Sequence, residues 1–288
     1  MHIILKEFIS TDDNLSTIVE KHYDKSQYLE TVFFKIVGKY NLEEVSSNLY
    51  LELDQAIIKG HADANIYLLF ISVVIRFTSI RNQLERARVI LSIGDSLSSK
   101  KISPILMAYF MIQKATLRHY ESLSEERDEL LKKAISLVDK KSPRYRSFVY
   151  LLAAIISEEG RLKELSKSDI SLINSPINEK QSVHCDELKL NNFIFNGDFQ
   201  NGFLVLENYQ KKFKGENSES INYFFQVLNI LKGDFNELNY RDALFKLYSK
   251  LCQQMVNGDL HEARNTFQSI KIGRWKVILN IPFLEYFP

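Results

Sequence analysis

The stretch from Ser103 to Pro143 reads SPILMAYFMIQKATLRHYESLSEERDELLKKAISLVDKKSP, with a Ser-Pro pair at each end and the two pairs 39 residues apart. A serine at the N-cap accepts a hydrogen bond from the free amides of the first helical turn, and proline at the next position already has a helical φ. Each pair therefore predicts a helix start, as does a third pair at Ser175-Pro176. Self-similarity at about 20 to 50 residues indicates a repeat protein, whose hairpins bury their apolar faces by stacking.

The composition favours an all-helical fold. Of the 288 residues, 45% are hydrophobic and 25% are charged, while only 10 Gly and 5 Pro are present, too few for a turn-rich sandwich or barrel. Because no linker-like segment interrupts the chain, we expect one continuous body, a right-handed α-solenoid of antiparallel helical hairpins. Apolar periodicity predicts a strand-like start, an amphipathic helix at 26–40, and helices at 44–59, 62–79, 82–98, 104–120, 124–140 and 143–158.

The second half of the chain adds a recurring Gly-Asp-apolar turn. It occurs at Gly197-Asp198-Phe199, Gly233-Asp234-Phe235 and Gly258-Asp259-Leu260, with a looser form at Gly160-Arg161-Leu162. Glycine can close one helix in the left-handed conformation, and aspartate can cap the next. Small residues follow the turns at Gly202 and Ala263, and larger ones at Leu206 and Phe267. A small residue in the second helix lets the first helix approach closely. The short interval from Gly233 to Gly258 predicts one long helix from Asn236 to Asn257.

These hairpins resemble the tetratricopeptide repeat family, which carries a Gly-Asp/Asn-Tyr-like turn, then a small residue, then an aromatic residue. The matching segments are Gly197 to Leu206, Gly258 to Phe267, and Asn82 to Leu91, where Asn82 takes the place of the turn glycine and Ala87 is small. The 39-residue spacing exceeds the family's period of about 34, so the repeats are divergent. The resemblance implies repeats over 46–270, an N-terminal helical or capping segment at 1–45 and an apolar tail at 271–288.

The resemblance also implies where a partner binds, because the first helices of such hairpins line a groove that takes peptides or partner helices. Counting back from the turns places six residues on or near this groove: Arg76, Arg118, Tyr150, Asn191, Tyr223 and Tyr248. Arginine can bind a carboxylate, asparagine can bind both groups of a peptide unit, and tyrosine offers apolar area with a polar tip. The alternative for each is an ordinary packed or solvated side chain.

The C-terminal tail is apolar and interrupted by proline. Its large side chains are Trp275, Phe283, Leu284, Tyr286 and Phe287. We expect the tail to cap the last hairpin, because solenoids need covered ends. A segment that binds a partner is the alternative. Deletion of residues 277–288 separates the two, since aggregation supports a cap, whereas a soluble protein without its partner supports an interaction segment.

Familiar catalytic and metal-binding patterns are missing from the sequence. There is no phosphate-binding Gly-rich loop followed by Lys-Ser/Thr, no GxGxxG and no GxSxG. His261-Glu262 is followed by Asn265, where a zinc site would need a second histidine. The run from His184 to Glu187 places four potential ligands on consecutive helical positions, which point in different directions. We therefore expect no metal and no cofactor.

Charge and cysteine content restrict the partner class and the location. The net charge of +1 gives no overall field for nucleic acid. Cys185 and Cys252 lack a CxxC spacing and suit reduced thiols in the cytoplasm. We expect neither a signal peptide nor a membrane span, because no apolar run of about 18 residues is present.

The leading hypothesis is therefore a non-enzymatic cytoplasmic scaffold that binds a protein or peptide, as an adaptor, chaperone or regulatory subunit. An alternative is a peptide-sensing regulator that resembles the bacterial pheromone receptors but lacks a DNA-binding domain, since the region before Glu43 is too short for one. A third hypothesis is an enzyme whose site is assembled across helices.

Overall fold

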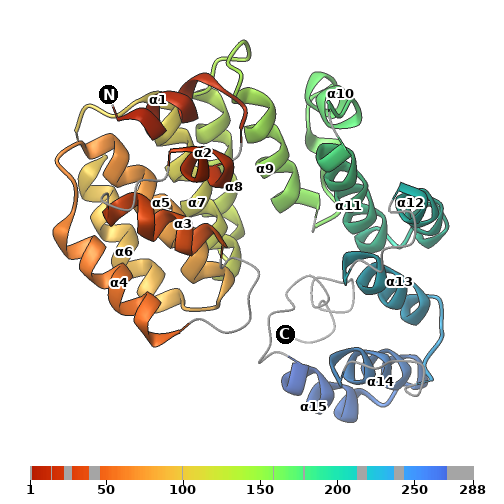
Figure 1. Ribbon diagram of the computed structural model, residues 1–288. Helices are drawn as coiled ribbons and strands as arrows, with labels where there is room; N and C mark the ends of the chain where they lie inside the picture. The colour runs from red at the N-terminus through yellow and green to blue at the C-terminus, as the bar shows by residue number, and fades with distance from the viewer. Residues whose placement is uncertain are drawn as a thin grey trace. The chain divides into compact units, whose positions relative to one another are not determined.

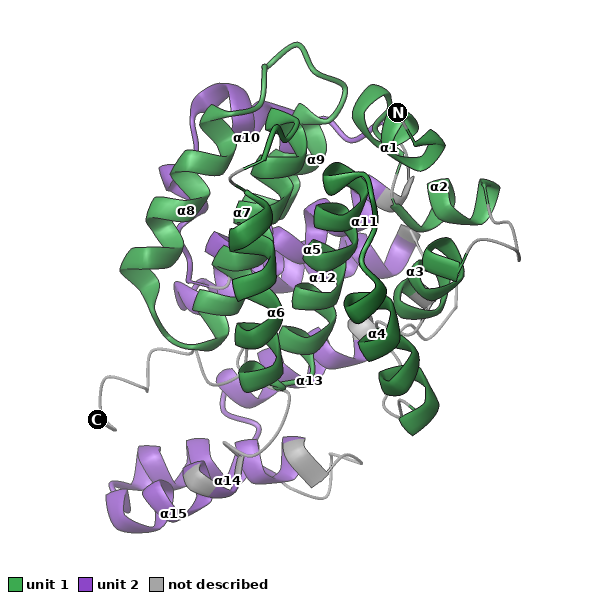
Figure 2. Ribbon diagram, turned by 90° about the vertical axis from the view of Figure 1, so that its left-hand side faces the viewer, with its two compact units in different colours: residues 1–152 green, residues 153–288 purple. Residues whose placement is uncertain are grey.

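A computed structural model describes residues 2–13, 15–22, 28–38, 46–98, 100–157, 159–177, 179–212, 219–236 and 243–270, and these residues form helices without strands (Figure 1). The predicted all-α class is confirmed. Contacts divide the chain into two compact units, residues 1–152 and 153–288, coloured separately in Figure 2. The boundary lies between residues 152 and 153, and the segment limits expected at 45 and 270 stay predictions. It falls inside a helix, so no change in composition marks it.

Unit 1 is built around one central helix. Its helices are α1 (Ile3–Ser10), α2 (Leu15–Lys21), α3 (Tyr28–Gly38), α4 (Ser47–Lys59), α5 (Ala64–Ile80), α6 (Leu84–Leu97), α7 (Pro104–Tyr120), α8 (Ser124–Ser136) and α9 (Tyr145–Ser157), the last of which crosses the boundary. Helix α5 packs against α3, α6 and α7, and 13 of its 17 residues are buried. Its sequence is apolar on every side, as expected of a helix enclosed by others.

Unit 2 continues with helices that pack on their neighbours in the sequence. They are the 3-10 helix η1 (Leu162–Glu164), then α10 (Lys167–Asn174), α11 (Glu179–Phe195), α12 (Phe199–Lys212), α13 (Glu219–Leu231), α14 (Ala243–Asn257) and α15 (Leu260–Ile270). From α11 to α15 each helix contacts the next. The core between them includes Leu190, Tyr209, Leu228 and Tyr248.

One turn recurs six times among the described residues. Its left-handed residues are Asn82, Ser122, Gly160, Gly197, Gly233 and Gly258, with φ from 56° to 108°. In each case the left-handed residue donates its N–H three residues back and the next N–H donates five residues back. Gly197 donates to the Ile194 carbonyl at 3.1 Å, and Asp198 to the Phe193 carbonyl at 2.9 Å. This is the Schellman turn. The intervals of 40, 38, 37, 36 and 25 residues show a recurring helical hairpin.

The turn predictions are largely confirmed. Each predicted glycine has a positive φ, and Asn82 does take the glycine's place. The small residues Ala87 and Ala263, five positions after their turns, are fully buried. The corresponding Gly202 is also buried, and a Cβ added to it would lie 3.0 Å from Leu228 Cδ2. Close approach of the helices therefore explains the small side chains.

The α7–α8 hairpin departs from this pattern in two ways. Its turn residue is Ser122, which was not among the predicted turn residues. Five positions later stands Arg127, which is 1% exposed, whereas the hairpins that turn at Asn82, Gly197 and Gly258 have alanine or glycine at this position. The guanidinium of Arg127 binds the Asp128 carboxylate at 2.7–2.8 Å, and its Nη1 lies 3.4 Å from His119 Nδ1. A neighbouring carboxylate thus offsets the cost of burying this charge.

Only one of the three Ser-Pro pairs begins a helix directly. Pro104 is the first residue of α7, with Ser103 as its N-cap. The pair Ser142-Pro143 forms a turn in which Ser142 Oγ accepts from the Arg144 N–H at 3.3 Å, and α9 begins at Tyr145. The pair Ser175-Pro176 precedes α11, which begins at Glu179. Prediction of a helix start at the last two pairs is therefore wrong by a few residues.

Two further expectations are wrong, and a third falls outside the described residues. The strand-like start is wrong, because residues 3–10 form α1, with Ile4, Leu5 and Phe8 on one buried face. The long helix predicted from Asn236 is also wrong at its start, since Asn236 is not helical, α14 begins at Ala243, and 237–242 lie outside the described residues. The tail at 271–288, with its predicted cap or interaction role, lies outside them as well. Within the described residues, no helix combines the length and apolar character needed to cross a membrane.

Candidate functional site

The six residues predicted for the groove differ in exposure. Arg76, Arg118, Asn191 and Tyr223 are partly exposed. Tyr150 and Tyr248 are only 6% and 1% exposed, so they have little surface to offer a partner. Arg76 and Arg118 lie on separate helices of unit 1, α5 and α7.

In unit 2 the structure brings Tyr223 and Tyr248 together. Burial raises the pKa of Tyr248 well above 10, and the neighbouring Cys252 and Tyr223 add to the rise. The Tyr223 ring also lies 5.8 Å from the Phe245 ring, between centroids. Tyr248 therefore belongs to the core of unit 2, and Tyr223 lies at the margin of that core.

Arg118 is engaged within its own hairpin. Its guanidinium binds Glu121 at 2.5 Å and Glu126 at 2.8 Å, and Glu121 also accepts from Arg88 Nε at 2.5 Å. Burial alone would raise the pKa of Glu121, but the hydrogen bonds from Arg118 and Arg88 outweigh it and hold the pKa below its ordinary value. These ion pairs fix the Ser122 turn, which gives Arg118 a structural role.

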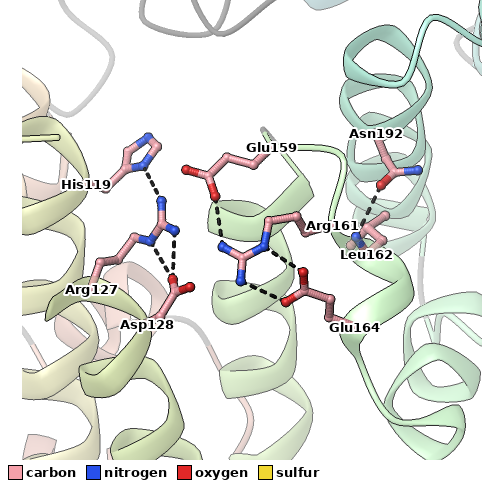
Figure 3. A network of polar contacts seen from close by, with 8 residues as sticks. All are labelled: His119, Arg127, Asp128, Glu159, Arg161, Leu162, Glu164 and Asn192. Atoms are coloured by element: carbon pink, nitrogen blue, oxygen red, sulfur yellow. Dashed lines mark hydrogen bonds and ion pairs between the residues drawn. The ribbon is translucent and has the colours of Figure 1, made fainter. Parts of the chain in front are cut away.

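A second polar network holds the irregular segment after α9. Arg161 binds Glu164 through two bonds of 2.7 and 2.8 Å and Glu159 through one of 2.9 Å (Figure 3). The Leu162 N–H donates to Asn192 Oδ1 at 3.2 Å, as Figure 3 also shows. Asn192, next to the predicted Asn191, thus fastens this segment to α11.

An open depression lies between α4 and the turn that joins α5 to α6. It is lined by Ser47, Tyr50, Leu51, Asp54, Asn82, Gln83, Leu84, Glu85 and Arg86. The Arg86 guanidinium lies 4.9 Å from the centre of the Tyr50 ring and binds Asp54, while Gln83 Nε2 donates to Tyr50 Oη at 2.5 Å. These polar groups bind each other, so their positions in the depression are fixed.

The most informative cluster consists of Arg76 on α5, Tyr109 on α7 and Arg144 at the start of α9. We call the side of these helices that carries the three residues the first-helix face. The Tyr109 ring meets the ring of Phe8 edge-on, with centroids 5.3 Å apart. Burial raises the pKa of Tyr109, while the charges of Arg76 and Arg144 act in the opposite direction. Two guanidinium groups therefore lie near one phenol on this face.

Arg144 contacts the N-terminal helix directly. It is 3% exposed, its guanidinium lies 4.1 Å from the centre of the Phe8 ring, and its Nε donates to the Phe8 carbonyl oxygen. Its Nη2 is buried without a hydrogen-bond partner. Desolvation lowers the pKa of Arg144 to about 10, against the opposing effect of Asp12. Phe8 and Arg144 were not among the predicted site residues, although the spacing of Ile4, Leu5 and Phe8 is helical.

Neither described cysteine has the properties of an activated nucleophile. Burial raises the pKa of the Cys252 thiol to about 12, which keeps it protonated at neutral pH, and Cys185 is buried as well. No group of three or more His, Cys, Asp or Glu side chains that could hold a metal ion occurs among the described residues. Comparison with protein-family models, curated proteins and solved structures finds no match to this chain.

Proposed function

We propose that this protein is a tetratricopeptide-like helical repeat protein that binds another protein or peptide and has no catalytic activity of its own. The observation that carries the proposal is the Schellman turn repeated six times, which sets helices in hairpins along the described chain. An array of hairpins presents extended side-chain surfaces, which suit a partner better than a small substrate.

The first-helix face of unit 1 supplies suitable chemistry. Arg76 and Arg144 can each donate to carboxylate or carbonyl oxygens, and guanidinium groups are well suited to such oxygens at interfaces. Tyr109 and the apolar core beneath offer area for an aromatic side chain. Together these groups favour a polypeptide ligand with both apolar and oxygen-bearing groups.

Affinity capture from the native host with the full-length chain, followed by titration calorimetry of each captured protein, tests this function. Arg76→Glu places a carboxylate on the first-helix face, and we expect it to weaken binding about tenfold. Lys132→Glu makes the same charge change on the exposed side of α8 and is the matched control.

An affinity that falls with Arg76→Glu and not with Lys132→Glu supports the proposal. Equal affinities for all three chains would contradict it, as would the absence of any stoichiometric partner. A chain that ends at residue 276 tests the tail as the binding segment, because a partner lost only with the tail moves the site away from unit 1.

A further inference from the structure

Helix α1 and the residues that flank it contact three parts of unit 1. At its start, the ring of His2 meets the ring of His61, in the turn before α5, at 5.9 Å between centroids. At its end, Phe8 contacts Tyr109 of α7. Asp12, just after the helix, accepts a hydrogen bond from the Ser147 hydroxyl of α9. The segment from His2 to Asp12 therefore contacts the turn before α5, helix α7 and helix α9.

The contact surface of α1 has the anatomy of a binding interface. Ile4, Leu5 and Phe8 are at most 2% exposed and form an apolar centre. Polar contacts surround it, including His2 to Glu30 of α3 and Glu7 to Lys21 of α2. An apolar centre with a polar rim is typical of protein interfaces. A helix of eight residues is unstable alone in water, so α1 depends on this docking for its structure.

The fit between α1 and the face is incomplete at Arg144. The side chain is buried, yet its Nη2 has no hydrogen-bond partner. The nearby Asp12 carboxylate is bound to Ser147 instead, and Asp13 is exposed. A buried guanidinium without a paired carboxylate is costly. A helix that brought a carboxylate to Nη2 would therefore fit this face better than α1 does.

From these contacts we propose that the first-helix face is a helix-binding site, that α1 is its resident occupant, and that the partner displaces α1 with an amphipathic helix of its own. That helix carries an aromatic residue in its last turn, where Phe8 lies, and a carboxylate that pairs with Arg144. This inference rests on the proposed function and names the class of partner for the same site.

The test uses a fluorescent peptide of residues 1–13, MHIILKEFISTDD, and the full-length chain with Phe8→Ala, which weakens the resident helix. Fluorescence anisotropy should show that the variant binds the peptide about tenfold more tightly than the unaltered chain does. A peptide with the same Phe8→Ala change should not bind. The matched control is Phe225→Ala, which removes a ring that is 47% exposed in unit 2 and should leave peptide binding unchanged.

Hydrogen exchange of residues 3–10 shows whether α1 has been released in the variant. Release without peptide binding, in a variant with unchanged helical circular dichroism, would overturn the proposal. Equal peptide binding by the unaltered and Phe8→Ala chains would overturn it too. If Phe8→Ala reduces the helical signal, Asp12→Ala replaces it, because this change removes the contact with Ser147 on α9 and the carboxylate near Arg144 but leaves the apolar face of α1 unaltered.

The carboxylate requirement has its own measurement. Peptides of residues 1–9 are prepared with a free C-terminal carboxylate and with an amide. We expect the free acid to bind the Phe8→Ala chain about tenfold more tightly, since its carboxylate follows Phe8 by one residue. Equal affinities would overturn the pairing with Arg144. Because these peptides need no host protein, failure here is distinguishable from failure to capture a partner.

Discussion

The guanidinium of Arg144 covers the ring of Phe8 at 4.1 Å from its centre and donates from Nε to the carbonyl oxygen of the same residue. These residues are 136 positions apart, so this contact joins the first helix of unit 1 to the start of α9. The pair identifies the place where the N-terminal segment is fastened to the hairpins.

Replacement of Arg144 by alanine is expected to lower the free energy of unfolding by about 2–3 kcal/mol, because the Phe8 carbonyl loses a charged donor and the ring loses its cover. Arg144→Met fills a similar volume without a buried charge and should cost about 1 kcal/mol or less. Urea denaturation of the full-length variants measures both. A greater loss for methionine than for alanine would contradict the view that the incompletely paired charge is costly.

Gly94 of α6 is expected to tolerate no side chain. An added Cβ would lie 2.4 Å from Phe110 Cε2 and 3.1 Å from Ile71 Cγ2, and both neighbours are buried. Although alanine favours helix by about 1 kcal/mol, overpacking should make Gly94→Ala a net loss of about 1–2 kcal/mol. Thermal or urea unfolding measures the stability of Gly94→Ala. The control is Ser92→Ala, at an exposed position of the same helix. Equal stability of the two variants would show that α6 can move away from its neighbours.

The turn residues should respond to substitution in opposite directions. Ser122 has φ 63°, so Ser122→Gly relieves strain and is expected to stabilise the protein by about 0.5–1 kcal/mol. Gly258 has φ 81° and no atom within 4 Å of an added Cβ, so Gly258→Ala should cost about 1 kcal/mol through backbone strain alone. Ser96→Gly, within helix α6, is the control and should be destabilising. Stabilisation by Ser96→Gly as well as Ser122→Gly would argue against the left-handed assignment.

Because its thiol is buried, Cys252 should make the protein less stable at alkaline pH. Burial raises the pKa from 9.0 to about 12, with the Tyr248 hydroxyl acting in the opposite direction. Between these values the unfolded chain releases a proton that the native chain keeps, so stability falls as pH rises through this range. The loss should reach about 1 kcal/mol at pH 10.

Urea midpoints at pH 8 and pH 10 measure this loss in the unaltered chain and in Cys252→Ala, in which the loss should be about 1 kcal/mol smaller. A thiol reagent should also leave Cys252 unmodified in the native protein and react once urea is added. An identical pH dependence in the two chains would assign the loss to other groups.

The local features of the fold were predictable from sequence because their causes are local. A glycine before aspartate at a helix end predicts a left-handed turn, and Gly197 and Gly258 bear this out. Ser122 was not predicted as a turn residue because serine seldom adopts a positive φ. Helix α1 was misread as a strand because eight residues give too little periodicity to separate the two.

The candidate site was less predictable, because it depends on contacts between distant residues. Nothing in the neighbourhood of Phe8 specifies an arginine 136 positions later. Arg76, which was predicted from its distance to the next turn, does lie near Tyr109. Tyr248 was predicted in the same way but lies in the core, because its position depends on how α13 and α14 pack. Residue type and spacing thus predict where a hairpin bends but not which segment covers its face.

Hydrogen exchange of the full-length chain, free and saturated with its captured partner, tests the central claim most directly. If the partner takes the first-helix face, the amides of residues 3–10 will exchange faster in the complex because α1 has been displaced, while those of α7 remain protected. A stoichiometric complex in which residues 3–10 keep the protection of the free protein would contradict the account.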